Sequence, residues 1–148
     1  MIGLVQRVAE ARVAIAGRVV GAIGPGALLF VCAEREDSEA LADRFVAKVL
    51  ALRIFADTAG KMNLDLAAIA GGLLVVSQFT LAADTSRGNR PSFVGAAGAE
   101  RGRVLYERVV ARARRLHGGE VASGEFGADM QVTLVNDGPV TIPMTMRG

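Results

Sequence analysis

The stretch Leu73-Leu74-Val75-Val76-Ser77-Gln78-Phe79-Thr80-Leu81 decides the fold, because it joins an uninterrupted apolar run to a polar end. Four consecutive aliphatic residues are typical of a central strand that is buried on both faces. The ends of such strands often deliver side chains and free backbone N–H groups into a ligand crevice. The segment therefore predicts a buried strand with a site at its end, although a polar end that merely closes the strand is the alternative.

The chain before this stretch carries further strand patterns. The β-branched runs around Ala16-Gly17-Arg18 predict a hairpin. Gly24-Pro25-Gly26 then breaks the chain before the apolar run 27–32. The single cysteine, Cys32, excludes an internal disulfide, fits a reducing cytosol and is expected to be a small buried hydrophobe.

Two amphipathic patterns predict helices. The first begins near Glu39 with Asp37 or Ser38 as its cap, and the second spans about 99–117. His117 would then stand at the end of the second helix as a capping or surface residue. The predicted buried stripes are Leu41, Phe45, Val49 and Leu52 in the first helix, and Leu105, Val109, Ala113 and Leu116 in the second.

Shorter elements complete the pattern. We expect a short strand at Ile54-Phe55, a short helix or turn over 64–70, and strands over 120–123, 130–135 and 139–146. Strands mixed with two long helices indicate one α/β or α+β domain over residues 1–148, with helices covering sheet.

Arginines are concentrated in one part of the chain. Residues 87–115 hold eight arginines and two glutamates, a net +6 against +2 for the whole chain. Arg101, Arg108, Arg112 and Arg115 share one face of the predicted helix. Such a surface fits a polyanion such as nucleic acid, although a solvated helix face is the alternative.

The sequence lacks the usual catalytic side chains. One histidine and one cysteine cannot form a His/Cys metal cluster, and no glycine-rich phosphate loop follows a strand. Asp84, Asp129 and Asp137 fall near loops without a surrounding motif. We therefore expect no metal and no cofactor, with chemistry carried by backbone groups or by the substrate itself.

No apolar stretch approaches the ~18 residues that a membrane span needs, and the first residues lack a signal-peptide layout. We therefore expect a cytoplasmic protein with no membrane partner.

Gly138-Pro139 is a second informative feature, within Asn136-Asp137-Gly138-Pro139-Val140-Thr141. These residue types are usual in a turn. Alternatively, a glycine without a side chain and a proline with fixed φ can present bare carbonyl oxygens rigidly to a ligand.

Several segments together resemble those of D-aminoacyl-tRNA deacylases, in order and over nearly the whole chain. They are Val5–Val8, Gly24–Gly26, Lys61–Leu64, Ser77–Leu81, Arg87–Phe93, Phe126–Met130 and Asn136–Thr141. The resemblance implies an enzyme that hydrolyses the ester between tRNA and a D-amino acid or glycine. It also implies a layered β/β/α fold and a homodimer, with tRNA as the partner.

The resemblance also implies roles for individual residues. Gly138-Pro139, with a cis peptide bond, would enter the partner subunit's site opposite Ser77–Thr80 and exclude L-amino acids by clash. Ser77 and Gln78 would position the substrate, and backbone N–H groups near Phe79 and Thr80 would hold the oxyanion.

The remaining roles concern tRNA binding and the attacking group. Phe126 and Met130 would line an adenine pocket or belong to the core. Arg87, Arg90 and some helix arginines would bind phosphates. The 2′-hydroxyl of the terminal ribose would assist the attack, while a covalent Thr80 nucleophile is the mechanistic alternative. A non-enzymatic nucleic-acid-binding module that uses the Arg87–Arg115 surface is the competing function.

Overall fold

A long, bent first strand organises the fold, which a computed structural model describes for all residues 1–148. The strands are β1 (Ile2–Ile15), β2 (Arg18–Ile23), β3 (Gly26–Cys32), β4 (Phe55–Ala56), β5 (Met62–Leu64), β6 (Gly72–Ser77), β7 (Val121–Ser123) and β8 (Gln131–Thr145). The helices are α1 (Glu39–Leu50), the 3₁₀ helix η1 (Phe79–Ala82) and α2 (Ala99–Leu116).

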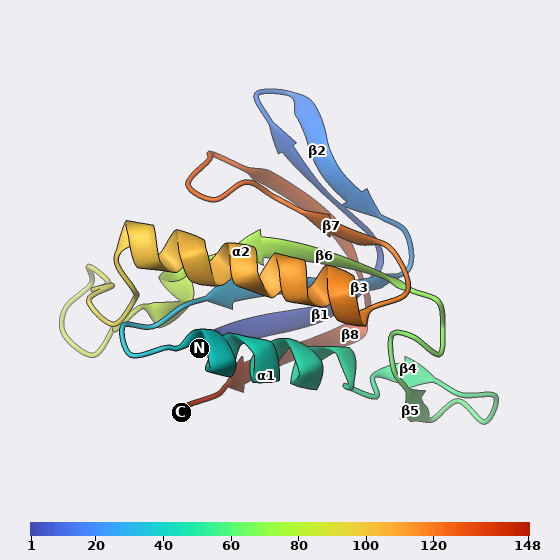
Figure 1. The fold of residues 1–148 in the computed structure, drawn as a ribbon. Coiled ribbons are helices and arrows are strands. Elements are labelled where there is room, and N and C mark those ends of the chain that lie inside the picture. The colour runs from blue at the N-terminus through green and yellow to red at the C-terminus, as the bar shows by residue number, and fades with distance from the viewer.

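The main sheet is mixed and curls into a nearly closed barrel (Figure 1). The first half of strand β1 pairs antiparallel with β3, and its second half pairs antiparallel with β2. The other edge of β1 pairs antiparallel with β8. Strand β6 lies parallel to both β3 and β7. Strand β7 then approaches β2 so closely that a Cβ on Gly21 would lie 2.6 Å from the Ser123 carbonyl oxygen. The single α/β domain that the sequence predicts is confirmed, with the sheet layers joined as a barrel.

Two apolar cores hold the layers together. A smaller core inside the barrel includes Val8, Leu28 and Leu74. A larger one lies between the sheet and the helices, around Phe45 and Leu105. Both helices therefore cover the same side of the barrel, where they lie next to each other (Figure 1).

The helix predictions are confirmed apart from details at the ends. Ser38 caps α1, since its hydroxyl accepts from the Leu41 N–H at 3.1 Å. Leu52 lies beyond the end of α1 and is only partly buried. The prediction that Leu116 is buried is wrong, because 45% of it is exposed at the last residue of α2.

His117 is the C-cap residue of α2, as predicted, but it is buried and not at the surface. Its extended backbone turns the ring inward, where Nε2–H donates to the Gly71 carbonyl at 2.7 Å. This contact with a distant loop explains why His117 is covered.

The strands predicted over 130–135 and 139–146 form one continuous strand, β8. Strand β1 pairs with both halves of β8 and so holds them in line, while residues 137–140 bulge out between the partners of Gln6 and Val8. The hairpin at Ala16-Gly17 is confirmed, with both residues at positive φ. Residues 66–70 form turns.

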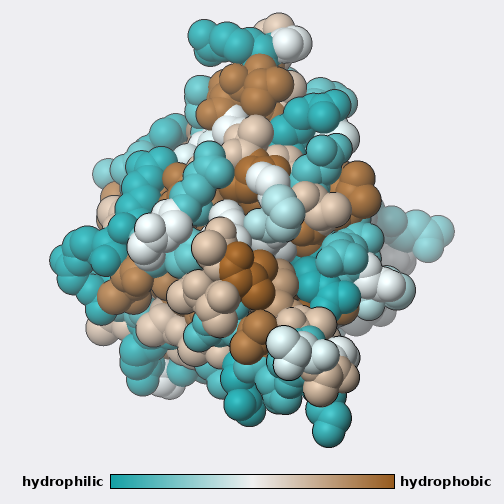
Figure 2. All heavy atoms as spheres, turned by 90° about the vertical axis from the view of Figure 1, so that its right-hand side faces the viewer, coloured by the Kyte–Doolittle hydropathy of each residue, from teal (hydrophilic) through white to brown (hydrophobic).

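The surface shows no extended apolar face on the side toward β4 and β5, where hydrophobic residues form separate groups among hydrophilic ones (Figure 2). None of the helices has the length and apolar character that crossing a membrane would require.

Candidate functional site

A largely apolar cavity of about 600 Å³ lies where β3 and β6 end. Its walls come from the ends of these two strands, the first turns of α2, and residues 126–130. Ser77, Gln78 and Phe79 all line it, as do Phe126 and Met130, so residues far apart in sequence meet here. A concave apolar cavity with a few polar groups is the usual form of a small-ligand site.

The turn after β6 leaves two backbone donors without partners. Gln78 N–H donates to Val31 O at 2.8 Å, and Leu81 N–H donates to Gln78 O at 3.2 Å. Between them, the N–H groups of Phe79 and Thr80 make no backbone hydrogen bond, since the first residues of a helix have no acceptor in their own helix. Two neighbouring free N–H groups at a cavity edge can bind a negatively charged oxygen.

The side chains of this turn contact each other. The Gln78 amide nitrogen donates to the Thr80 hydroxyl oxygen, and this is the one side-chain hydrogen bond that Thr80 makes. An amide nitrogen cannot remove a proton from the hydroxyl. The hydrogen-bond partner of the Thr80 hydroxyl is therefore not a base that would activate it as a nucleophile.

Tyr106 and Phe126 form one wall of the cavity. The Tyr106 hydroxyl is buried and lies 3.0 Å from Val75 O and 3.2 Å from Gly124 O. Burial raises the pKa of Tyr106 to about 12, so the hydroxyl stays protonated and donates. The Phe126 ring packs against Tyr106 with centroids 5.9 Å apart, and Phe126 is only partly buried because one side faces the cavity.

A second aromatic pair ties the turn to the following loop. The rings of Phe79 and Phe93 meet edge to face at 5.2 Å, although 57% of Phe79 is exposed. The bridge between Asp84 and Ser92 closes the loop with backbone bonds of 2.7 and 3.0 Å. Arg87 and Arg90 are exposed within this closed loop, outside the cavity lining.

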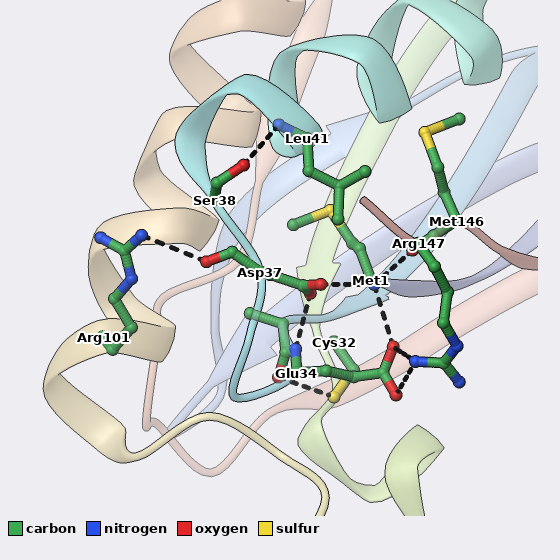
Figure 3. Close-up of polar contacts among 10 residues, drawn as sticks. Met1, Cys32, Glu34, Asp37, Ser38, Leu41, Arg101, Met146 and Arg147 are labelled. Atoms are coloured by element: carbon green, nitrogen blue, oxygen red, sulfur yellow. Dashed lines mark hydrogen bonds and ion pairs between the residues drawn. The ribbon is translucent and has the colours of Figure 1, made fainter.

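A charged cluster surrounds the N-terminal ammonium of Met1, a residue of the cavity lining (Figure 3). The Met1 ammonium donates to Glu34 and to Asp37, each at 2.9 Å, and to the Met146 carbonyl at 2.7 Å. Arg147 donates to both carboxylate oxygens of Glu34 at 2.7 Å. The cluster ties both ends of the chain to the loop that follows β3.

This cluster sets the charge states beside the cavity. Burial disfavours the charged form of Glu34, but hydrogen bonds from Arg147 and the N-terminal ammonium outweigh it and lower the pKa of this carboxyl. Burial, and then the charge of Glu34, raises the pKa of the Cys32 thiol to about 11. The thiol is therefore neutral and buried, as the sequence predicts, and is no nucleophile.

Gly138 and Pro139 lie in the bulge of β8, exposed and outside this cavity. Their peptide bond is cis. Arg7 holds the bulge, because its Nε donates to Asp137 O at 2.7 Å and another guanidinium nitrogen donates to Ile54 O at 2.8 Å. The Asn136 amide donates to Arg7 O and Val140 O, both at 3.0 Å.

The arginines of α2 lie on two faces. The face that holds Arg101, Arg108, Arg112 and Arg115 is turned toward α1, where Arg108 pairs with Asp43 at 2.7 Å and Glu39 at 3.0 Å. Arg103 lies about 200° further around the helix from Arg101. Its guanidinium covers Phe126 with 5.0 Å from the guanidinium carbon to the ring centroid.

The structure brings together Ser77, Gln78, Phe79, Phe126 and Met130, with Thr80 next to them on the exposed side of the turn. It leaves Arg87, Arg90 and the Gly138-Pro139 pair apart from the cavity. The sequence analysis assigned no site role to Arg7, Asn136 or Tyr106. Arg7 and Asn136 lie in segments that carry the family resemblance, which is the signal that could have singled them out.

The mixed barrel, two covering helices and a cavity at the strand ends define a small single-domain α/β protein with a largely apolar candidate site. The family model described as D-Tyr-tRNA(Tyr) deacylase matches residues 4–145. The chain is 66% identical over 146 residues to the D-aminoacyl-tRNA deacylase of Variovorax paradoxus (strain S110), covering 99% of both chains. Against the D-aminoacyl-tRNA deacylase of Methylibium petroleiphilum (strain ATCC BAA-1232 / LMG 22953 / PM1) the identity is 64%, covering 99% of this chain and 95% of the relative.

Two solved structures are also similar to this chain. A structure titled c-Myc DNA Unwinding Element Binding Protein matches at a TM-score of 0.94 and 35% identity, covering all of both chains. A probable eukaryotic D-amino acid tRNA deacylase matches at 0.83 and 16% identity over 97% of both chains, which shows the fold alone.

The chain belongs to the D-Tyr-tRNA(Tyr) deacylase family. The predicted family is thereby confirmed, and so is the prediction of an enzyme, an ester hydrolase of the D-aminoacyl-tRNA deacylase type.

Proposed function

We propose that this protein hydrolyses the ester of D-aminoacyl-tRNA and of glycyl-tRNA in the cytoplasm, releasing the free amino acid and tRNA. The observation that carries the proposal is the pair of free N–H groups of Phe79 and Thr80 at the edge of an apolar cavity. Ester hydrolysis passes through a tetrahedral oxyanion, and two preorganised N–H groups are the donors that stabilise such an anion.

The attack on the ester needs a proton acceptor, and the cavity lining contains neither histidine nor lysine, with Asp129 as its one charged side chain. The 2′-hydroxyl of the terminal ribose lies beside the ester in the substrate itself and assists the attack. Gln78 and Ser77, both at the cavity wall, position the ester and the adenosine. Phe126 and Met130 provide apolar surface for the adenine ring.

Gly138-Pro139 acts in the cavity of a second subunit. The bulge is held by Arg7 and Asn136 but faces no cavity of its own chain. Strand β8 pairs with β1 alone, so its other edge has no partner within one chain, and 49% of Val135 on this strand is exposed. A homodimer covers such an edge and places each bulge against the partner's cavity.

The bulge then selects D-amino acids by excluding L-amino acids from the cavity. Its carbonyl oxygens accept hydrogen bonds from the substrate ammonium and occupy the space into which an L side chain would project. Glycine carries no side chain and cannot be excluded in this way. The same arrangement accepts many D-amino acids, because it makes no contact that depends on the identity of the side chain.

The exposed loop arginines Arg87 and Arg90 bind phosphates of the acceptor stem. No carboxylate pairs with either of them. Their contribution falls as salt concentration rises, since phosphate contacts release counterions.

A non-enzymatic nucleic-acid-binding module is the second candidate, favoured by the net +6 of residues 87–115 and by the DNA-binding title of one similar structure. Such a module would need the arginines but not Gly138-Pro139. Changes in the bulge should therefore alter the enzyme's activity but leave the tRNA binding of such a module unchanged.

The experiment is a deacylation assay with D-Tyr-tRNA, L-Tyr-tRNA and Gly-tRNA. We expect cleavage of the D-tyrosyl and glycyl forms only. Equal cleavage of the L form would refute chiral exclusion, and binding of tRNA without cleavage of any form would favour the second candidate.

A further inference from the structure

We propose that Arg103 binds the phosphate that links the terminal nucleoside of the tRNA to the rest of the chain. This inference rests on the proposed function, since it takes the cavity to hold that nucleoside. It assigns one arginine of α2 to the substrate and leaves the opposite face of the helix out of the site.

Arg103 is the arginine of α2 that adjoins the cavity. Its guanidinium lies over Phe126, a lining residue, at 5.0 Å, and a Cβ on Gly127 would be 3.9 Å from one of its nitrogens. Gly127 has a φ of +79° and no side chain, so it leaves room beside the guanidinium. Arg103 thus stands beside the cavity lining, and we take the 5′ oxygen of a bound nucleoside to leave the cavity on this side.

Its charge is available for a ligand. The nearest carboxylate, Glu107, is 3.9 Å away, and the side chains of both residues are more than half exposed, at 54% and 63%. Such a pair contributes little and is readily exchanged for a stronger partner. By contrast, Arg108 is held by Asp43 and Glu39 on α1, and Arg101 donates to Asp37 O at 3.1 Å.

The aromatic ring orients the guanidinium. Phe126 is fixed by Tyr106 on one side and by close contact with the backbone at Gly102, where a Cβ would lie 3.3 Å from the ring. A planar guanidinium resting on this ring keeps its outer N–H groups free for two parallel bonds to phosphate oxygens. Asp129 is the one charged side chain in the cavity lining, so a cation at the rim also offsets its repulsion of a phosphate.

The test compares two ligands that differ only in the phosphate: 3′-O-D-tyrosyl-adenosine and its 5′-monophosphate. We expect Arg103→Ala to lower kcat/KM about tenfold for the monophosphate and to leave the unphosphorylated ester almost unchanged. Arg103→Lys should restore part of the loss, because it keeps the charge but not the planar fork. The matched control, Arg108→Ala on the opposite face, should affect neither ester.

An equal loss on both esters would overturn the inference, because Arg103 would then act only by packing on Phe126. The absence of any loss on either ester would also overturn it. Binding of AMP and adenosine, measured by calorimetry, separates this inference from the proposed function. If the wild-type protein cleaves neither D-Tyr-tRNA nor either ester, the proposed function fails. The inference then stands only if Arg103→Ala weakens AMP binding and spares adenosine, and it falls if both ligands bind the variant as they bind the wild type.

Discussion

The turn after β6 and the bulge of β8 are opposite in construction. The turn at residues 77–82 lines a cavity and leaves the N–H groups of Phe79 and Thr80 unpaired. The bulge at residues 137–140 is fixed by Arg7 and Asn136 but lines no cavity of its own chain. One segment offers free donors at the edge of a cavity, and the other is an exposed, anchored bulge outside that cavity.

Under the proposed function, this difference assigns the two segments of one chain to two different active sites of a dimer. In that proposal the donors of the turn stabilise charge in the reaction, while the bulge decides which substrate enters. Changes in the turn should therefore lower the rate for every substrate. Changes in the bulge should alter the ratio between D and L substrates.

The largest expected effect comes from removing one backbone donor. Proline fits the first position of a helix and lacks an N–H, and Gln78 before it already has a non-helical backbone. We expect Phe79→Pro to lower kcat for D-Tyr-tRNA by roughly 100- to 1000-fold, or about 3–4 kcal/mol. Phe79→Ala is the matched control, since it removes the ring but keeps the N–H, and equal losses in both variants would contradict the oxyanion role.

The next effect concerns the bulge. A Cβ on Gly138 would lie 2.3 Å from the backbone nitrogen of Val140, so Gly138→Ala forces the bulge to shift. We expect D-Tyr-tRNA cleavage to fall about tenfold or more and L-Tyr-tRNA cleavage to become measurable. Gly24→Ala, where nothing lies within 4 Å, is the control. An unchanged preference for the D form in the folded variant would remove the selective role of the bulge.

A smaller effect is expected at Thr80, whose hydroxyl contacts only the Gln78 amide. Thr80→Ala should reduce kcat by less than about tenfold, because the backbone N–H remains. Complete loss of activity with the fold intact, together with an acyl-enzyme trapped in the wild type, would favour the covalent alternative.

The smallest effect concerns stability in acid beside the cavity. The pKa of Glu34 is lowered on folding from its ordinary value of 4.5, so its contribution is complete well above that pH and is lost as pH falls below it. Glu34→Gln should therefore have a lower thermal midpoint than the wild type at pH 7. The difference between the two thermal midpoints should become smaller below about pH 4. A difference that does not change with pH, followed by circular dichroism, would contradict the charged cluster of Figure 3.

Local patterns in the sequence were sufficient for much of the fold. The apolar run 73–76 and the stripes around Phe45 and Leu105 carry their own periodicity, and these elements formed as predicted. Contacts between distant segments were not predictable in this way. Strand β8 continues through Gly138-Pro139 because β1 pairs with both sides of it, and His117 is buried because Gly71 lies opposite.

The candidate site shows the same difference between features that the sequence predicts and contacts between distant segments that it does not. The resemblance singled out Ser77–Thr80 and Phe126–Met130, and Ser77–Phe79 and Phe126–Met130 meet at the cavity. The shared face of Arg101 and Arg108 was visible in the sequence, but its neighbours on α1, Glu39 and Asp43, were not. The anchoring of the bulge by Arg7 depends on a register between residues about 130 positions apart in the chain.

Mixing two defective subunits tests most directly whether the half-sites belong to different chains. Phe79→Pro lacks a donor in the cavity, Gly138→Ala lacks a correctly shaped bulge, and each homodimer alone should cleave D-Tyr-tRNA poorly. After the chains are unfolded and refolded together, half of the dimers should be mixed, and each mixed dimer should hold one fully wild-type site. The account predicts recovery to about one quarter of wild-type activity, from random pairing of the two chains. Activity equal to the average of the two separate variants, with mixed dimers demonstrably present, would contradict it.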